Sequence, residues 1–199
     1  MHDDIAGRTV ADLGCGTGML TAGALLLGAQ HITALDVDPD AIAQAQDNLS
    51  SLGAEEGEDV TFQLADLGAS DGGPADGPCP VPLVDTVIMN PPFGTRVEGI
   101  DVHFLTLAVR RARRAVYSMH KSSTRAHILK VASQLGAPAT TLATMRFPIP
   151  RMYAHHTQDS VDVEVDLVRL DTSGVDHTGS VSEGVGSATP PTAAAAAAA

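Results

Sequence analysis

A short apolar segment runs directly into a glycine-rich turn near the start of the chain, and this feature constrains the fold most. Residues Val10–Gly18 read Val-Ala-Asp-Leu-Gly-Cys-Gly-Thr-Gly, and an apolar stretch follows over residues 18–28. Glycine allows a positive φ and lets the backbone approach a ligand closely. A buried strand, a tight turn and a helix in this order indicate the first unit of an α/β fold with a parallel sheet.

Strand and helix patterns then alternate along most of the chain. The sequence predicts strands at 9–13, 31–35, 60–64, 84–89 and 115–119, and helices at 18–28, 39–52, 101–114 and 122–135. Two longer strands, 140–147 and 161–170, close the domain, and the second alternates apolar with charged residues. We therefore predict an α/β doubly wound sheet, mostly parallel, which ends in an antiparallel strand pair.

The length and composition indicate one domain followed by a tail. The 199 residues suit a single α/β domain, which we place at residues 1–171. Residues 172–199 are rich in Gly, Ser, Thr and Pro and end in an alanine run, so we predict a disordered tail. No apolar run approaches the roughly 18 residues of a membrane span. Cys15 and Cys79 lie far apart, so neither a disulfide framework nor a metal site is indicated, and we expect the nucleus or the cytoplasm.

Charge is distributed unevenly between the two halves of the chain. The formal net charge is −12, and residues 1–89 hold one basic residue against fifteen acidic ones, whereas residues 90–170 hold eleven basic against six acidic. One explanation is an uneven surface without a binding role. The other is that the second half faces a polyanion. The basic residues that favour a nucleic acid are Arg110, Arg111, Arg113, Arg114, Lys121, Arg125 and Lys130. Those on outward helix faces could contact phosphates, and ordinary solvation of a helix is the alternative.

The glycine-rich turn has the spacing Gly-x-Gly-x-Gly, which differs from the Gly-x-Gly-x-x-Gly spacing typical of pyrophosphate binding. Gly14, Gly16 and Thr17 form this turn, and Asp12 lies just before it. A carboxylate there suits an ammonium group and repels a pyrophosphate. Asp36 ends the next predicted strand and is placed to accept hydrogen bonds from a ribose diol. The alternative for Asp36 is a helix-start charge, although the following Asp-Pro pair already supplies such a cap.

The third predicted strand adds a further acceptor. Asp66 follows that strand and could accept a hydrogen bond from an adenine amino group, with Leu67 lying against the purine. Taken alone, Asp66 is equally consistent with a solvated loop residue. Taken together, the carboxyl ends of successive strands offer groups that match the ammonium, ribose and adenine parts of S-adenosylmethionine. We expect this molecule to be the cofactor.

The fourth predicted strand ends in the tetrapeptide Asn90-Pro91-Pro92-Phe93. The two prolines fix the backbone and remove two donors, so the carbonyl groups stay free to accept. The Asn90 side-chain oxygen and the Pro91 carbonyl can hold both N–H groups of an aryl amine such as adenine N6, whose lone pair is otherwise delocalised into the ring. Catalysis would then rest on positioning and electrostatics. Phe93 can stack on the base. The alternative is a tight Asn-Pro turn.

These residues carry a resemblance to a known family. Asn-Pro-Pro-Phe is the tetrapeptide of amino-directed class I methyltransferases, and residues 85–94, 115–124 and 160–167 together resemble the methyltransferase-like protein 5 family. The resemblance implies a class I Rossmann-like fold and methylation of adenosine N6 in small-subunit ribosomal RNA. It also implies S-adenosylmethionine contacts and a catalytic loop at the matching positions: Gly14, Thr17, Asp36, Asp66, Leu67 and residues 90–93.

The resemblance further implies a partner. Family members pair with a small zinc-binding activator subunit, and Val60–Leu64 is predicted to lie at an open edge of the sheet where a strand of another chain could add. A cover over that edge from residues 68–82 is the alternative. Family members also begin with a segment that contains a Gln-Tyr-x-Thr motif, which this sequence does not contain.

Two other functions fit parts of the pattern. One is a methyltransferase that acts on a protein glutamine amide or on DNA adenine. Glutamine-directed enzymes share Asn-Pro-Pro followed by an aromatic residue, but they lack the segment His120–Thr124. The other is a binding subunit that keeps the fold without turnover. The intact tetrapeptide argues against that reading, and the absent family N-terminal motif argues for it.

Overall fold

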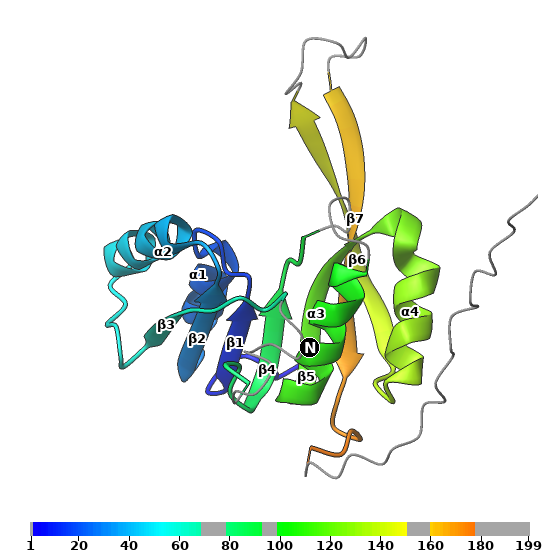
Figure 1. The fold of residues 1–199 in the computed structure, drawn as a ribbon, viewed down its shortest axis with the longest axis horizontal. Helices are drawn as coiled ribbons and strands as arrows, with labels where there is room; N and C mark the ends of the chain where they lie inside the picture. The colour runs from blue at the N-terminus through cyan, green and yellow to red at the C-terminus, as the bar shows by residue number, and fades with distance from the viewer. Residues whose placement is uncertain (1, 69–78, 93–98, 151–159, 178–199) are drawn as a thin grey trace, which may run out of the picture.

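The computed structural model describes residues 2–68, 79–92, 99–150 and 160–177. Within them, one seven-stranded sheet has the order β3-β2-β1-β4-β5-β7-β6 (Figure 1). The strands are β1 (Thr9–Leu13), β2 (His31–Asp36), β3 (Val60–Leu64), β4 (Val84–Met89), β5 (Ala112–Lys121), β6 (Ala139–Pro150) and β7 (Ser160–Asp171). The helices are α1 (Met19–Leu26), α2 (Pro39–Ser51), α3 (Ile100–Arg111) and α4 (Arg125–Gln134), with a 3-10 turn at Ser122–Thr124.

The strand directions confirm the predicted fold class. Strands β3, β2, β1, β4 and β5 pair in parallel, and β7 runs antiparallel to both β5 and β6. The chain builds outward from β1 to β3 on one side and then reverses to add β4 and β5 on the other. Such a reversal leaves a crevice at the carboxyl ends of the two central strands.

The core divides into two clusters because both faces of the sheet are covered. In β4, Val87 and Met89 belong to a cluster with residues of α3 and α4, whereas Ile88 belongs to a cluster with residues of α1 and α2. Successive side chains of a strand point to opposite faces. A near-continuous apolar strand is therefore what a sheet with helices on both faces requires.

The boundary between α3 and β5 differs from the sequence prediction. A helix was predicted to continue to residue 114, but α3 ends at Arg111 and β5 begins at the next residue, Ala112. Val84 pairs with Ala112 in the β4–β5 ladder, so pairing with the neighbouring strand overrides the helix propensity of this arginine- and alanine-rich segment. Arg113 and Arg114 consequently lie on a strand and not on a helix face.

Two features at the end of the domain are not evident from the sequence pattern. Asp166 is one of the charged residues that alternate with apolar ones in β7, and its side chain is fully buried. Packed residues also follow residue 171, where we placed the end of the domain. Thr172 is buried and its N–H donates to the Arg114 carbonyl, and Val175 packs against the larger core cluster. The predicted disordered tail lies outside the described residues from residue 178 onward.

The antiparallel pair β6–β7 extends beyond the rest of the sheet. Both strands have 12 residues, and the paired segment runs from Ala139–Leu170 to Pro150–Ser160. In Figure 1 this arm rises above the sheet on the side where the parallel strands end. The arm therefore stands beside the crevice. In the described part of the chain, no helix is long and apolar enough to cross a membrane.

Gly18 begins α1 in a conformation that only glycine adopts readily. Its φ is 84°, and a Cβ there would lie 2.8 Å from Leu49 Cδ2 of α2. The left-handed backbone costs an L-residue about 1–2 kcal/mol, and the contact adds to that cost. Gly18→Ala should therefore lower the free energy of unfolding by at least about 1–2 kcal/mol, measured by urea denaturation.

Gly23 offers a matched control in the same helix. A Cβ there meets nothing within 4 Å, and its φ is not positive. Gly23→Ala should raise the free energy of unfolding by about 0.5–1 kcal/mol, because alanine loses less backbone entropy in a helix. Equal effects of the two substitutions would contradict the packing described here.

Candidate active site

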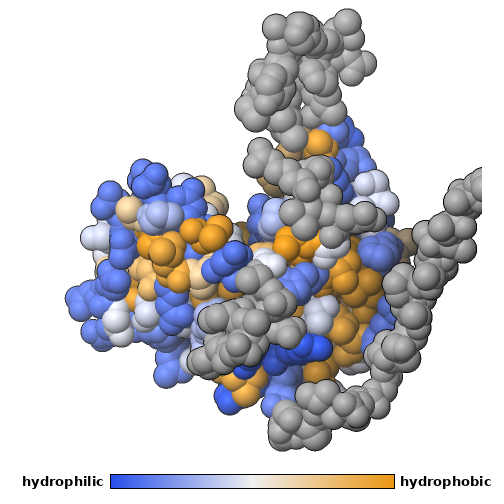
Figure 2. Space-filling model, in the orientation of Figure 1, coloured by the Kyte–Doolittle hydropathy of each residue, from blue (hydrophilic) through white to orange (hydrophobic). Residues whose placement is uncertain are grey.

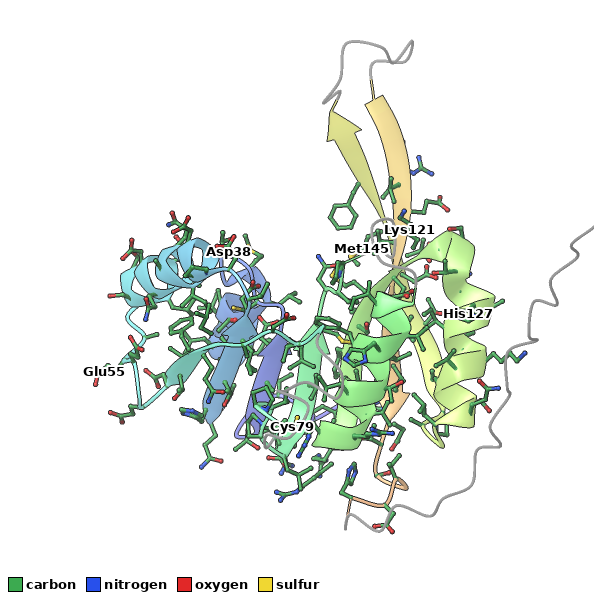
Figure 3. All side chains as sticks on the ribbon, viewed as in Figure 1. Asp38, Glu55, Cys79, Lys121, His127 and Met145 are labelled. Atoms are coloured by element: carbon green, nitrogen blue, oxygen red, sulfur yellow. The ribbon has the colours of Figure 1, made fainter. Side chains whose placement is uncertain are left out.

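The residues singled out in the sequence gather at one edge of the sheet. Gly14 follows β1, Asp36 ends β2, Asp66 follows β3 and Asn90 follows β4. These four strands are parallel, so their carboxyl ends share an edge. Figure 3 shows the labelled Asp38 at this upper edge of the sheet and Cys79 at the lower one.

The glycine-rich turn is held by acceptors from the end of β2. The N–H groups of Gly14 and Cys15 donate to the Leu35 carbonyl over 2.8 and 2.9 Å, and the Gly16 N–H donates to Asp36 Oδ2 over 2.7 Å. Gly14 and Gly16 have φ values of 72° and 54°. Because these three amides already have partners, the turn is poorly suited to cradle a phosphate. This supports the prediction that the ligand is not a dinucleotide.

Asp36 links two loops at the edge. Its Oδ2 accepts from Gly16, and its Oδ1 accepts from the Asp38 N–H over 3.0 Å. The cap of α2 is a different residue, because Asp38 Oδ1 accepts from the Asp40 N–H over 2.9 Å. Asp36 is therefore not needed as the charge at the start of α2, which was the alternative role for it. The carboxylate remains partly exposed and keeps lone pairs for a diol.

Asp12 lies beneath the turn and is fully buried. Its Oδ2 accepts from Thr21 Oγ1 over 2.6 Å, whereas its Oδ1 is buried without a hydrogen-bond partner. Burial raises the pKa of Asp12 to about 7. An unpaired buried carboxylate oxygen is stabilised by a nearby cation, so this carboxylate fits a ligand that brings an ammonium group to the turn.

Thr17, Asp66 and Leu67 complete the predicted donor residues. Thr17 is exposed on the turn, and its carbonyl accepts from Asn48 Nδ2 over 2.9 Å. Asp66 is exposed after β3, and its Oδ1 accepts from the Gly68 N–H over 2.9 Å. Leu67 differs from expectation, since its side chain is only 3% exposed and belongs to the core. It is therefore not available to lie against a purine.

The acceptors along the edge fit S-adenosylmethionine. Asp12, whose buried carboxylate is stabilised by a cation, lies under the turn after β1. Asp36 ends β2 and can accept from a diol, and Asp66 follows β3 and can accept from an amino group. These three groups match the ammonium, ribose and adenine parts of that molecule in order. When bound there, S-adenosylmethionine supplies an electrophilic methyl group.

The tetrapeptide begins next to the glycine-rich turn. Leu13 and Met89 are register partners in the parallel β1–β4 ladder, so Gly14 and Asn90 both follow directly from paired residues. Neighbouring strands lie about 4.8 Å apart. Asn90 and Pro92 are exposed and Pro91 is buried, whereas Phe93 lies outside the described residues. The structure thus brings the predicted donor turn and the start of the predicted catalytic loop together.

Several supporting residues were not identified from the sequence. Thr21 holds Asp12, and His103 Nε2 of α3 donates to the Leu67 carbonyl over 2.8 Å, which ties α3 to the loop after β3. Ser118 Oγ lies 2.7 Å from Nε2 of the buried His120, and Ser118 is the register partner of Met89. Burial lowers the pKa of His120 to about 4, so its imidazole is neutral at neutral pH.

A second buried network stabilises the base of the β6–β7 arm. Asp166 accepts from Arg125 Nε over 2.6 Å and Nη2 over 2.7 Å, and also from Ser122 Oγ and Thr144 Oγ1, each over 2.8 Å. The hydrogen bonds from Arg125 lower the pKa of Asp166 to about 2. The partners lie 22 to 44 residues away from Asp166 in the chain, so a local sequence pattern gives no signal for them.

The state of Asp12 predicts a pH dependence of methyl-donor binding. A cationic ligand favours the ionised carboxylate, whose pKa is about 7 in the free protein. Affinity should therefore fall as the pH falls below about 7, by up to about tenfold per pH unit. Asp12→Asn should weaken binding and flatten this profile, measured by calorimetry between pH 7.5 and about 5.5. A flat profile for the parent protein would refute the electrostatic role.

The role of Asp36 predicts a loss of donor affinity. Asp36→Ala removes the acceptor of Gly16 and of the ribose diol, and unpaired buried hydroxyl groups cost roughly 1–3 kcal/mol. Calorimetry should show donor binding weakened by about 5- to 150-fold. Asp38→Ala is the control, because it removes the cap of α2 and should cost about 1 kcal/mol of stability without a comparable loss of affinity. If Asp38→Ala weakens donor binding more than Asp36→Ala does, Asp36 has only a structural role.

Comparisons with known proteins extend over different parts of the chain. The family model of the ribosomal protein L11 methyltransferases (PrmA) matches residues 3–77. The rRNA N(6)-adenosine-methyltransferase Mettl5 of Drosophila melanogaster is 40% identical over 171 residues, which cover 85% of this chain and 76% of that protein. METTL5 of Danio rerio, with the same description, is 39% identical over 169 residues and 84% and 77% of the two chains.

A solved structure agrees with these relatives. A candidate RNA methyltransferase from Pyrococcus horikoshii has 34% sequence identity and a TM-score of 0.68, and the match covers 84% of this chain and 74% of that one. The L11 methyltransferase model stops before β4, so it covers the donor strands and not the tetrapeptide. The matches to METTL5 extend over most of both chains. The chain therefore belongs to the METTL5 family of rRNA N(6)-adenosine-methyltransferases.

Proposed function

We propose that this protein transfers a methyl group from S-adenosylmethionine to N6 of an adenosine in small-subunit ribosomal RNA. One observation carries the proposal. Asn90 and Pro91 begin the loop after β4, immediately beside the donor turn that follows β1, because Leu13 and Met89 are paired. An amine held by the loop after β4 therefore lies next to a methyl donor held by the turn after β1. The names of the relatives in fly and fish specify adenosine N6 in ribosomal RNA.

The chain contributes positioning more than acid–base chemistry. The Asn90 side-chain oxygen and the Pro91 carbonyl accept the two N–H groups of the amine, which favours a pyramidal nitrogen with its lone pair aimed at the donor. Proline at positions 91 and 92 has no N–H, so neither competes for these acceptors. Phe93 stacks on the base once it has left its helix. Orientation of this kind supplies a large part of the rate enhancement of a two-substrate reaction.

A protein glutamine amide is the rival acceptor. The match to ribosomal protein L11 methyltransferases covers residues 3–77, which hold the donor turn, Asp36 and Asp66. Every S-adenosylmethionine-dependent enzyme of this fold needs such a region, whatever its acceptor. The acceptor side of this protein begins at Asn90 and includes the basic second half of the chain. That charge favours a nucleic acid over a protein side chain.

We also propose that a small zinc-binding activator subunit adds a strand to β3. Among the described strands, β3 lies at one edge of the sheet and pairs with β2 alone. Glu56 bridges to Val60 at its start, so the open part of the edge is Thr61–Leu64. An open edge offers unpaired backbone groups to another chain.

Apolar surface beside the edge supports this partner. Leu64 and Val37 are 63% and 60% exposed, and Leu64 is the register partner of Asp36, the neighbour of Val37. Figure 2 shows apolar surface on the left of the molecule, in the region of α2 and β3. Exposed apolar patches next to polar surface are typical of protein interfaces. Phe62, in contrast, packs against the α1–α2 cluster and contributes to the fold.

The catalytic role of Asn90 predicts a loss of turnover. Asn90→Ala removes an acceptor that acts in the transition state, so kcat for methylation of small-subunit ribosomal RNA should fall by about 10²-fold or more. Donor affinity should change by no more than a few-fold, because the donor contacts lie on β1 to β3. Methyl incorporation into RNA and calorimetry measure the two quantities.

Asn90→Asp provides the control for this experiment. It keeps an acceptor oxygen in nearly the same volume, so it should retain more activity than Asn90→Ala. Full activity of the alanine variant would remove Asn90 from the mechanism. A parent protein that methylates protein glutamine and leaves RNA unmodified would replace the proposed acceptor.

The partner proposal predicts a difference between the two edges of the sheet. Leu64→Lys places a charge on the open part of β3 and should abolish co-purification with a co-expressed zinc-binding subunit, measured as the zinc content of the purified complex. Leu142→Lys is the control, because Leu142 is 42% exposed on β6 at the opposite edge. Zinc retained by the first variant, or lost equally in both, would exclude β3 as the docking strand.

A further inference from the structure

Four arginines lie at the end of the sheet opposite the candidate active site. Arg110 and Arg111 are the last residues of α3, and Arg113 and Arg114 are near the start of β5. The amino ends of the parallel strands lie at this edge, whereas the donor turn and Asn90 lie at the carboxyl ends. We call these four residues the amino-edge arginine cluster.

The cluster carries charge that the protein itself leaves largely unneutralised. Within the described residues, Arg110, Arg111 and Arg113 form no ion pair, and Arg110 and Arg113 are exposed. The other arginines in the described residues differ, because each pairs with one or more carboxylates: Arg8, Arg125, Arg146 and Arg169. A structural role through ion pairs therefore does not account for the cluster.

The surroundings of the cluster contain few acids, and buried nitrogen atoms of Arg114 and His177 lack hydrogen-bond partners. Asp85 lies within electrostatic reach of Arg113, but it already accepts two hydrogen bonds from Thr9. Asp176 lies beside His177, whose Nδ1 is 3.3 Å from the Arg110 carbonyl. Arg114 is half-buried, and its Nε has no hydrogen-bond partner. An anion at this edge would therefore meet an excess of positive charge and arginine N–H groups that are free to donate hydrogen bonds.

A larger group of acidic residues lies at the other end of the same edge. Glu55, Glu56, Glu58 and Asp59 directly precede β3, which is three strands from β4 in the sheet order. The edge thus changes from acidic beside β3 to basic beside β5 and α3. A polyanion at this edge is attracted to the β5 side and repelled from the β3 side.

The register between β4 and β5 gives the distance between the cluster and the active-site edge. Ser118 is the partner of Met89, so Arg113 lies about six residues before the level of Asn90, which is roughly 20 Å at about 3.3 Å per residue. Double-stranded RNA is recognised mainly through its shape and its phosphates, with contacts spread over as many as about 16 base pairs. An RNA whose adenosine enters the active site is long enough to reach the opposite edge.

We propose that the amino-edge arginine cluster binds the phosphate backbone of the RNA substrate roughly 20 Å from the active-site edge that receives the target adenosine. This proposal rests on the RNA acceptor proposed above. The cluster gives no sequence information, because phosphate contacts position a nucleic acid without reading its bases. It anchors the flanking part of the RNA and sets the direction in which the RNA crosses the α3–β5 side of the protein.

Charge reversal tests the proposal through the salt dependence of binding. The affinity of the protein for purified small-subunit ribosomal RNA is measured at several salt concentrations for the parent, Arg110→Glu and Arg113→Glu. Each variant should bind several-fold more weakly near 0.1 M salt, and its plot of log affinity against log salt should be shallower by about one unit. Donor affinity, measured by calorimetry, should equal that of the parent, since the cluster is remote from Asp36.

Lys130→Glu is the matched control. Lys130 is exposed on α4, forms no ion pair in the described structure, and undergoes the same change of charge. It should leave the salt slope unchanged. If the parent binds and methylates the RNA but both arginine variants keep the salt slope of the parent, the proposed role of the cluster is wrong and the proposed function stands. Equal loss in all three variants would show a diffuse charge effect and overturn it too. A parent that neither binds nor methylates the RNA would overturn the proposed function, and the cluster with it.

Discussion

The reversal of strand order between β1 and β4 is the constraint on which the rest of the structure depends. The chain extends from β1 to β3 in one direction and from β4 in the other, so the loops after β1 and β4 diverge and leave a crevice. The pairing of Leu13 with Met89 then sets the donor turn beside Asn90. A two-substrate transfer needs its reacting atoms about 3–3.5 Å apart. Two adjacent parallel strands are a rigid way to supply that proximity.

The same edge concentrates polar groups whose burial is unfavourable without a ligand. Asp12 keeps one oxygen unpaired in the interior, and Asp36 divides its two oxygens between Gly16 and Asp38. Buried carboxylates with raised pKa values are more common at functional sites than elsewhere. The hydrogen bond from Thr21 fixes the orientation of Asp12, so its free oxygen is held in place before any cation arrives. The site is thereby preorganised for a cationic ligand.

Much of this fold and site was predictable because the signals are local. The Gly-x-Gly-x-Gly turn, Asp36 and the tetrapeptide each follow a short apolar strand, so periodicity alone places them at strand ends. The errors arise where tertiary contacts decide. Nothing local separates Arg111 from Ala112, and only pairing with β4 ends the helix there. Leu67 follows an exposed residue yet turns into the core. Asp166 is buried because Arg125, 41 residues away in the chain, hydrogen-bonds to it.

The identity of the methylated atom is the central claim, and isotope labelling measures it directly. The purified protein is incubated with small-subunit ribosomal RNA and S-adenosylmethionine that carries a deuterated methyl group, and the digested nucleosides and protein are examined by mass spectrometry. The proposed function predicts the label on adenine N6, as deuteromethylated N6-methyladenosine. Label on a ribose, on another base or on a protein glutamine, with adenine N6 unlabelled, would contradict it.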